Sequence, residues 1–279
     1  MRILITGINS KLGLLLAKRL SKKHEVIGLG TRDLGSFKTV KFDLSSDKEL
    51  DLELVDICVH LAFVTDNKIC EEDEKAYRTN ILGTKKMLDY CKEKSVKKFI
   101  LASSGGVYGF RDETLDEDMN LNPVNRYSEM KCESESLSKK YTNNFEICIL
   151  RFFFPYGPNT KKNTLINRLI SNIKNGEPIL IHKSKKPRIN PIFVEDLISS
   201  IELFCFVDTG KFNIFNLAGL NHVSIFDIAV ILGNLLDKKP LFQYSNEKYK
   251  NMIANTQKLS EYYENKTNLR SGLKKTVEL

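Results

Sequence analysis

The chain has 279 residues, 42% of them hydrophobic, and a formal net charge of +8. This length and apolar content allow one large domain, or one domain with a smaller lobe, and exclude a disordered chain. The positive charge is spread over short lysine pairs without the interleaved aromatic residues of an RNA-binding platform, so it favours a solvated surface over a nucleic-acid partner.

The first half of the chain alternates apolar runs with helical patterns. Continuous apolar runs predict strands buried on both faces, and the helices between them predict a parallel sheet. This order predicts an α/β fold, a doubly wound parallel sheet of the Rossmann type. The expected strands are residues 2–6, 26–30, 39–42, 56–63, 98–104 and 146–154, with helices at 12–20, 74–94 and 127–141.

After residue 155 the pattern changes. We expect a turn-rich segment, a helix at 164–175, a strand at 178–182, a basic loop at 183–188, a helix at 194–206, a strand at 212–217, a helix at 224–236 and a polar tail. We therefore assign residues 1–155 to an NAD(P)-binding Rossmann domain. Residues 156–279 are expected to form mainly a small substrate-binding lobe, with some segments returning to the first domain.

The loop between the first strand and the first helix has the composition of a dinucleotide-binding turn. Gly7 permits a tight turn and Gly13 permits close packing of helix on strand, while Ser10 stands where a third glycine is usual. Such a loop brings backbone and a helix N-terminus to a pyrophosphate; the alternative is a plain strand–helix turn. The expected cofactor contacts here are Gly7, Asn9, Ser10, Lys11, Leu12 and Gly13.

The residues at the end of the second strand indicate whether the fold binds NADP or NAD. An acid at this place bonds the adenosine ribose, and a nearby arginine suits a 2′-phosphate. The sequence reads Gly30-Thr31-Arg32-Asp33. Thr31 followed by Arg32 slightly favours NADP, with Arg32 as a contact, and Asp33 leaves NAD open.

The amino terminus and the cysteines indicate the compartment. MRILITG reads as a buried strand without a basic leader or cleavage site, and no apolar run reaches the ~18 residues of a membrane span. The six cysteines form no CxxC pair and have no histidine at ligand spacing. We therefore expect a cytoplasmic protein with reduced thiols, no metal and no membrane partner.

Further segments recur in a characteristic order. They are Asp43-Leu44, His60-Leu61-Ala62, Tyr77-Arg78-Thr79-Asn80-Ile81-Leu82-Gly83-Thr84, Ser103–Gly109, Tyr127–Lys131, Arg151–Pro158 and Val194-Glu195-Asp196. Together they resemble the extended short-chain dehydrogenases/reductases, specifically the nucleotide-sugar epimerase/dehydratase/reductase group. The resemblance implies a nucleotide-diphosphate sugar as substrate. It also implies further cofactor contacts at Asp43, Leu44, Leu61, Ala62, Phe63, Asn80, Tyr127, Lys131 and Phe154.

Three residues form the expected catalytic set. Tyr127 precedes Lys131 by four residues on a helix, so both side chains share one face. A cationic Lys131 is expected to lower the Tyr127 pKa and so make the phenol a general acid/base. Ser104, at the carboxyl end of a strand, is expected to hydrogen-bond the same substrate oxygen, while His60 is interpreted as structural.

The sequence narrows the choice among the reactions that this group catalyses. Dehydratases of the group carry an acidic pair after the catalytic hydroxyl, where this chain has Gly105-Gly106, so 4,6-dehydration is disfavoured. Arg32 and the short chain favour a 4-keto reductase, and the Ser-Ser-Gly-Gly stretch fits an NAD-dependent 4-epimerase equally well. The alternatives of another class are a non-catalytic NAD(P)-sensing protein and an RNA-binding relative.

Two positions depart from the family pattern. Phe154 stands where an asparagine usually contacts the substrate, and Arg188 lies near the place of the diphosphate-binding arginine in a slightly altered register. We expect Ser104, Phe154 and Arg188 to bind substrate, Arg188 through bidentate hydrogen bonds. The resemblance also implies a homodimer built from the helices at 74–94 and 127–141.

Overall fold

The computed structural model describes residues 1–158, 160, 163–183, 187–246 and 251–278. Contacts between Cα atoms divide the chain into two compact units. The first unit comprises Met1–Val107, Leu121–Arg151 and Ile198–Phe215, and the second comprises Tyr108–Asn120, Phe152–Leu197 and Asn216–Leu279. The functional division at residue 155 stays a prediction.

The central element is a sheet with seven strands among the described residues. Pairing is parallel from β3 through β2, β1 and β4 to β5, with Ile3 opposite both Val26 and Ile57. The chain thus starts in the middle of the sheet and builds outward in both directions, which confirms the doubly wound Rossmann fold. The spatial order is β3 (Lys38–Lys41), β2 (Glu25–Gly30), β1 (Arg2–Thr6), β4 (Ile57–His60), β5 (Lys98–Ser104), β6 (Glu146–Phe152) and β9 (Phe212–Leu217).

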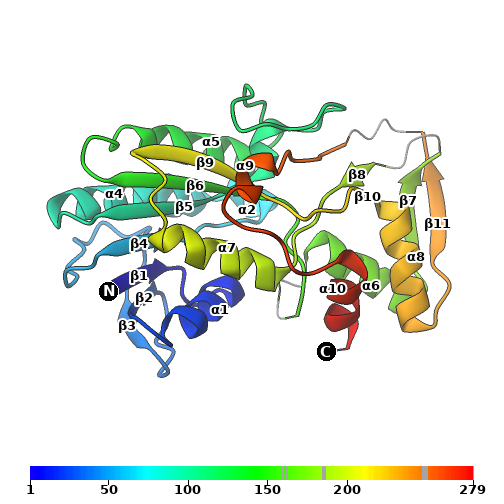
Figure 1. Cartoon of the computed structure of the whole chain (residues 1–279), viewed down its shortest axis with the longest axis horizontal. Helices are drawn as coiled ribbons and strands as arrows, with labels where there is room; N and C mark the ends of the chain where they lie inside the picture. Colours follow the sequence, from blue (N-terminus) through cyan, green and yellow to red (C-terminus); the bar gives the residue numbers. More distant parts are fainter. Residues whose placement is uncertain (159, 161–162, 184–186, 247–250, 279) are drawn as a thin grey trace. The chain divides into compact units, whose positions relative to one another are not determined.

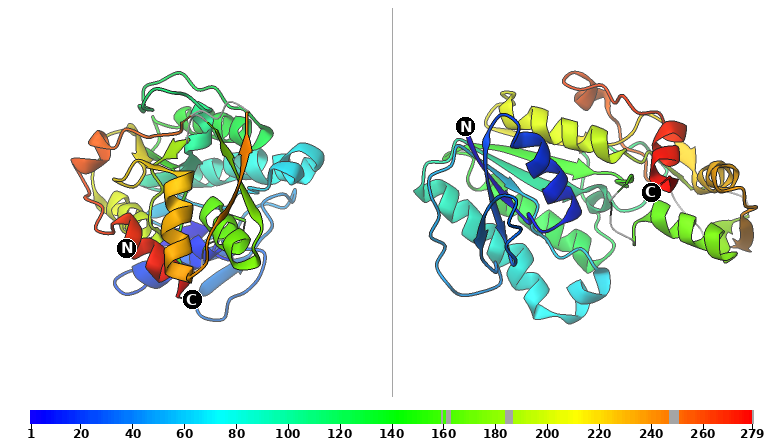
Figure 2. Two further views of the ribbon diagram at one scale, coloured as in Figure 1. Left: turned by 90° about the vertical axis from the view of Figure 1, so that its right-hand side faces the viewer. Right: turned by 90° about the horizontal axis from the view of Figure 1, so that it is seen from below.

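Helices cover both faces of this sheet. Helices α1 (Lys11–Leu20) and α7 (Val194–Phe206) lie on one face, and α4 (Gly83–Glu93) and α5 (Arg126–Lys139) lie on the other (Figures 1 and 2). Leu88 and Cys91 of α4 pack in one core cluster with Cys58 of β4 and Phe99 of β5. Because β1, β4 and β5 are apolar on both faces, their carboxyl ends are held rigidly at one edge of the sheet.

The helix expected at 74–94 is divided into three pieces. They are α3 (Glu74–Tyr77), a π-helical turn η1 (Arg78–Leu82) and α4. A short helix α2 (Asn67–Glu72), begun by the Asp66 side chain, precedes them and was not expected. The strand expected at 56–63 ends at His60, because residues 61–64 leave the sheet to form a loop. The π-helical turn η1 lies opposite this loop. Turns of this kind are frequent at functional sites.

The second unit combines small sheets with helices. Strands β7 and β11 pair in parallel, β10 and β8 pair antiparallel, and α8 packs against both α6 and α10. The tail, which was expected to be polar and to which no helix or strand was assigned, contributes β11, α9 and α10. In the basic loop expected at 183–188, residues 184–186 lie outside the described residues. The elements are α6 (Leu165–Asn175), β7 (Pro178–His182), β8 (Arg188–Ile189), β10 (Val223–Ser224), α8 (Ile225–Leu236), β11 (Leu241–Ser245), α9 (Gln257–Ser260) and α10 (Leu269–Val277).

Neither a membrane span nor a metal cluster is found in the described part of the chain. The helices there are too short or too polar to cross a bilayer. The described His, Cys, Asp and Glu side chains form no group of three or more that could hold a metal ion. All six cysteines are free thiols.

Candidate active site

The loop after β1 is shaped around its two glycines. Gly7 has φ +69°, and a Cβ atom there would lie 2.8 Å from the Ala62 nitrogen. A Cβ atom on Gly13 would lie 2.5 Å from the Gly7 carbonyl oxygen. Neither position accepts a side chain, so the backbone stays open to close approach by a ligand. This cradle at the start of α1 fits the pyrophosphate of a dinucleotide, which would meet the helix N-terminus there.

Ser10 and Asn9 have separate tasks in this loop. The Ser10 hydroxyl caps α1 by accepting the Gly13 N–H at 3.0 Å. Its first role is therefore to stabilise the start of the helix, and any contact with a phosphate comes second. The Asn9 side chain spans to the end of β2, where its amide donates to the Arg32 carbonyl at 2.8 Å and accepts the Arg32 N–H at 3.0 Å. Lys11 and Leu12 form the first turn of α1.

A pocket of the first unit opens beside this loop. Eight of the residues expected to contact the cofactor line it: Gly7, Asn9, Ser10, Asp43, Leu44, Leu61, Ala62 and Phe63. Arg32, Gly13 and Asn80 are not among its lining residues. Sequence reasoning missed Phe42, Val64, Lys75 and Thr79, which also line it. Lys75 carried no motif signal, and it reaches the pocket because α3 packs beside the loop after β3.

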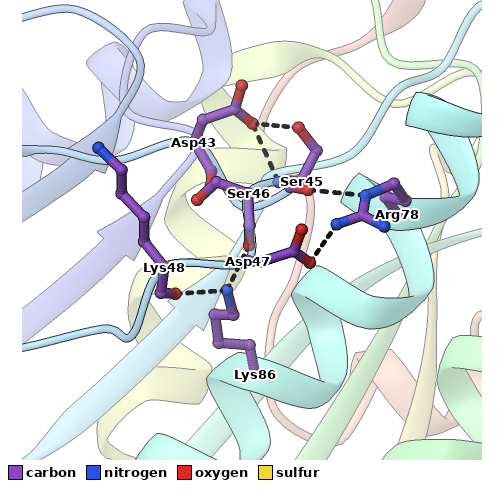
Figure 3. A network of polar contacts seen from close by, with 7 residues as sticks. All are labelled: Asp43, Ser45, Ser46, Asp47, Lys48, Arg78 and Lys86. Atoms are coloured by element: carbon purple, nitrogen blue, oxygen red, sulfur yellow. Dashed lines mark hydrogen bonds and ion pairs between the residues drawn. The ribbon is translucent and has the colours of Figure 1, made fainter.

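The loop carrying Asp43 and Leu44 is held in place by side chains that donate hydrogen bonds to its main-chain carbonyls (Figure 3). Arg78 donates to the Ser45 carbonyl at 2.9 Å and pairs with Asp47, while Lys86 donates to the Ser46 and Lys48 carbonyls at 2.6 and 2.8 Å. These cations come from η1 and α4. The helix segment therefore holds in place the part of the pocket wall that carries the expected cofactor contacts Asp43 and Leu44.

The Asp43 carboxylate lies in this wall and is already occupied. It accepts the Ser45 N–H at 2.9 Å and the Ser45 hydroxyl at 2.7 Å, and it pairs with Lys75 at 3.1 Å. The hydrogen bond from the Ser45 hydroxyl, helped by the Ser45 N–H and by Lys75, lowers the pKa of Asp43. Asp43 therefore stays ionised at neutral pH.

Asn80, which is expected to contact the cofactor, bonds to the main chain of the loop after β4. It is fully buried in η1, and its side chain accepts the Val64 N–H at 2.7 Å and donates to the Val64 carbonyl at 3.1 Å. This pair of bonds replaces a sheet ladder for the loop that leaves β4. Asn80 thus positions the loop carrying Leu61, Ala62 and Phe63 from behind.

His60 anchors the same loop from below, as expected of a structural residue. Its Nε2 lies 3.0 Å from the Thr84 hydroxyl, which itself donates to the Asn80 carbonyl, so Nε2 carries the proton. Its Nδ1 then accepts from Thr6, whose hydroxyl oxygen accepts the Ala62 N–H at 3.1 Å. Burial, with the charge of Lys131, lowers the pKa of His60 to about 3, so the ring is neutral.

The three expected catalytic residues come together at the carboxyl end of β5. Asn125 caps α5 by accepting the Ser128 N–H at 2.9 Å, which sets Tyr127 in the first turn of the helix. Tyr127 and Ser104 are hydrogen-bonded, and the Ser104 hydroxyl also accepts the Gly106 N–H at 3.1 Å. Lys131, one turn further on, is buried and donates to the Ala102 carbonyl at 2.6 Å.

The electrostatics of Tyr127 differ from the sequence-based expectation. Burial raises its pKa to about 12, against a smaller lowering by the hydrogen bond with Ser104. The Lys131 ammonium lies 5.9 Å from the centre of the Tyr127 ring and only 3.4 Å from that of Phe63. The expectation that Lys131 lowers the Tyr127 pKa is therefore not met, because its charge is directed to Phe63 and the Ala102 carbonyl.

A buried ion pair supports the catalytic residues from behind. Glu135, one turn after Lys131 on α5, accepts from Arg151 of β6 at 3.0 and 2.7 Å and from the neighbouring Ser103 hydroxyl. Both charged side chains are almost fully buried. Since breaking a buried pair leaves an uncompensated charge, this pair ties α5 to β5 and β6.

Two of the expected substrate-binding residues, Phe154 and Arg188, lie in the second unit. Phe154 has φ +45°, a strained conformation for a residue with a side chain. Arg188 is exposed in β8, where its N–H bonds to the Asn251 side chain at 2.9 Å and its carbonyl accepts from Met252. Asp196 of the V-E-D segment binds Tyr263 and the Lys266 and Thr267 N–H groups, so it anchors the C-terminal segment.

Comparison with known proteins identifies a matching family, related sequences and similar structures. A profile of the NAD dependent epimerase/dehydratase family matches residues 3–218. A dTDP-D-glucose 4,6-dehydratase of Dictyostelium discoideum is 29% identical over 84% of the chain but only 62% of its own length. An uncharacterized UDP-glucose epimerase of Bacillus subtilis is 26% identical over 98% of the chain and 96% of its own length. The UDP-glucuronic acid 4-epimerase of Bacillus cereus, solved with UDP-glucuronic acid and NAD, has a TM-score of 0.87 at 24% identity, over 100% of this chain and 98% of that one.

Proposed function

Because this chain belongs to the NAD dependent epimerase/dehydratase family, we propose that it is an NAD(P)-linked enzyme acting at C4 of a sugar carried by a pyrimidine nucleoside diphosphate. The observation that carries the proposal is the hydrogen-bonded pair of Ser104 and Tyr127, with Lys131 one turn further along the helix. The names of the relatives, which specify UDP- and dTDP-sugars, support the substrate class.

The residues have separate roles in this proposal. Tyr127 exchanges a proton with the C4 oxygen as general acid/base, and Ser104 holds that oxygen by a hydrogen bond. Lys131 binds the nicotinamide ribose. When bound, the nicotinamide would supply the hydride transfer. Glu135 bonds to Arg151 of β6 and to Ser103 of β5 and so holds α5 against both strands, which keeps the three groups aligned.

Among the reactions of the family, we propose 4-epimerisation first. Positions 105 and 106 are glycines, and a Cβ atom at Gly106 would lie 2.7 Å from the Ser128 hydroxyl and 3.3 Å from that of Ser104. Neither glycine supplies the acidic side chain that water elimination needs, which argues against 4,6-dehydration. The Bacillus subtilis relative, which aligns with nearly its whole length, supports the epimerase.

A 4-keto reductase is the second candidate. The observation that favours it is the absence of an acid at the end of β2, where Gly30-Thr31-Arg32 suits an exchangeable NADPH. Incubation with UDP-glucose and UDP-glucuronic acid, and separately with UDP-4-keto-6-deoxy-D-glucose and NADPH, followed by chromatography, separates the two. An epimerase interconverts C4 isomers without net use of added cofactor, whereas a reductase consumes one NADPH for each 4-keto sugar reduced. Failure of both reactions, with cofactor bound, would overturn the substrate assignment.

Ser104 is expected to shift the pH profile through Tyr127. Its hydrogen bond lowers the Tyr127 pKa, so Ser104→Ala should raise that pKa further. A phenol with a higher pKa stays protonated to higher pH, so the rise of kcat/KM with pH in the oxidative direction should move upward. The control is Ser103→Ala, whose hydroxyl binds Glu135 instead; it should reduce stability and leave the profile in place. An unshifted profile in Ser104→Ala would contradict the proposed pairing.

Assembly stays a prediction. We propose a homodimer through the faces of 74–94 and 127–141, as the family resemblance implies. Light scattering at micromolar concentration should give twice the chain mass of 32.0 kDa. A monomer mass under those conditions would contradict it.

A further inference from the structure

The ring of Phe63 contacts two members of the expected catalytic set. The Lys131 ammonium lies over the ring, 3.4 Å from its centre. The Tyr127 ring meets it edge to face, with 5.8 Å between the ring centroids and 88° between the ring planes. Phe63 also lines the cofactor pocket, in the loop that follows β4. The sequence predicts a cofactor contact at this position and assigns Phe63 no role toward Lys131.

The loop that carries Phe63 is fixed on both sides of it. The Ala62 N–H donates to the Thr6 hydroxyl at 3.1 Å, and the main chain of Val64 makes two hydrogen bonds with the Asn80 side chain. The ring itself packs against a small buried cluster made of Cys70, Ala76, Ile81 and Met130. The place of the ring is therefore set before any ligand enters the pocket.

Lys131 depends on this ring because its ammonium is buried. The residue is 3% exposed, and the ammonium donates to the Ala102 carbonyl at 2.6 Å. A buried charge needs groups that replace its water shell. The electron-rich face of an aromatic ring is such a group, and it binds a cation more strongly when water is excluded. Phe63 and Ala102 thus hold the charge at a defined place, 5.9 Å from the centre of the Tyr127 ring.

We propose that Phe63 is a positioning residue for the catalytic set: its ring holds the Lys131 ammonium beside the Ala102 carbonyl rather than at Tyr127, and so keeps Tyr127 a neutral phenol. A positive charge closer to a phenol would favour the phenolate. Phe63 acts through Lys131 and needs no contact with the substrate. The inference rests on the proposed function only in taking Tyr127 as the acid/base.

Two other groups that act on Tyr127 are neutral. Ser104 of β5 contributes a hydroxyl, and Cys70 of α2 contributes a thiol whose pKa is raised by burial. His60 of β4, which faces Lys131, is a neutral ring because burial lowers its pKa to about 3. Charged side chains of α5 and of the elements packed against it form pairs of their own: Arg126 with Glu129, Glu135 with Arg151, Lys85 with Asp89, and Arg78 with Asp47.

The test follows the titration of Tyr127 by NMR of the protein with isotope-labelled tyrosine rings, without substrate or cofactor. The Tyr127 signal is the one that Tyr127→Phe removes. Phe63→Leu keeps an apolar side chain and removes the ring, so the ammonium should move toward Tyr127 and the phenolate fraction at a given pH should rise about tenfold or more. Tyr141, whose pKa is raised to about 12 by burial and by Asp89, is the internal control and should titrate as in the wild type.

A second substitution covers the case in which Phe63→Leu fails to fold. Fluorinated phenylalanine at position 63 keeps the shape of the ring and weakens the negative charge of its face. The phenolate fraction of Tyr127 should rise with each added fluorine atom. A Tyr127 titration that stays in place across this series would overturn the proposal.

The double variant identifies Lys131 as the carrier of the effect. In a Lys131→Met protein, Phe63→Leu should leave the titration of Tyr127 unchanged, because the ammonium that the ring holds is absent. An equal rise in phenolate with and without Lys131 would mean that the smaller side chain acts by admitting water, and it would overturn the proposal. Since no turnover is measured, failure of the sugar-nucleotide assignment leaves both results unaffected.

Discussion

Replacing Tyr127 by phenylalanine should lower turnover by about 10²–10⁴, the usual contribution of a positioned general acid/base. The variant removes only the hydroxyl. The ring keeps its edge-to-face contact with Phe63, at 5.8 Å between centroids, and the capped start of α5 is unchanged. Cofactor affinity should therefore stay near that of the wild type, and the loss should appear in single-turnover measurements.

Lys131→Met provides the contrasting result. The ammonium is buried, donates to the Ala102 carbonyl and lies over the Phe63 ring, so its removal changes the pocket wall as well as the charge. Both turnover and cofactor affinity should fall. Tyr141→Phe is the matched control, because it removes a hydroxyl that donates to the Asp89 carboxylate at 2.6 Å. Tyr141 does not line the cofactor pocket. Near-wild-type turnover in Tyr127→Phe would remove Tyr127 from its proposed role.

Replacing Gly13 by valine should abolish detectable cofactor binding. The added Cβ atom would lie 2.5 Å from the Gly7 carbonyl oxygen and 3.0 Å from the Ile8 Cα atom, both of which are backbone. The loop must open to relieve this contact, and the N–H groups at the start of α1 then lose their alignment on the pyrophosphate. Calorimetric titration with NADH and NADPH measures the loss.

The control for this variant lies on the same helix. Lys18→Val places the same branched side chain at an exposed position of α1, so it reports the cost of valine in the helix alone. It should bind cofactor as the wild type does. Thermal unfolding of both variants separates local opening of the loop from global loss of structure. Unchanged affinity in a folded Gly13→Val protein would show that this loop does not bind the dinucleotide.

The parallel sheet and the phosphate loop were predictable from the sequence. Their signals are local: continuous apolar runs for β1, β4 and β5, and Gly7 and Gly13 placed between a strand and a helix. The Tyr127–Lys131 spacing likewise determines that both residues share one helix face. Order along the chain was enough to place Ser104 at the same edge, because the carboxyl ends of parallel strands lie together.

The pocket wall was less predictable, because it depends on contacts distant in sequence. A 3.6-residue periodicity at 74–94 does not reveal the π turn at Arg78–Leu82, which forms where Asn80 bonds to the Val64 main chain. Lys75 carries no motif, yet it reaches Asp43 across 32 residues.

The sequence by itself determined the fold class, the family resemblance and the residue types of the catalytic set. Only the tertiary structure decided the protonation chemistry of that set. Lys131 is close to Tyr127 in sequence, but its ammonium bonds to Ala102, and burial raises the Tyr127 pKa instead. A pKa depends on desolvation and on the direction of each neighbouring charge, and both are set by packing in three dimensions.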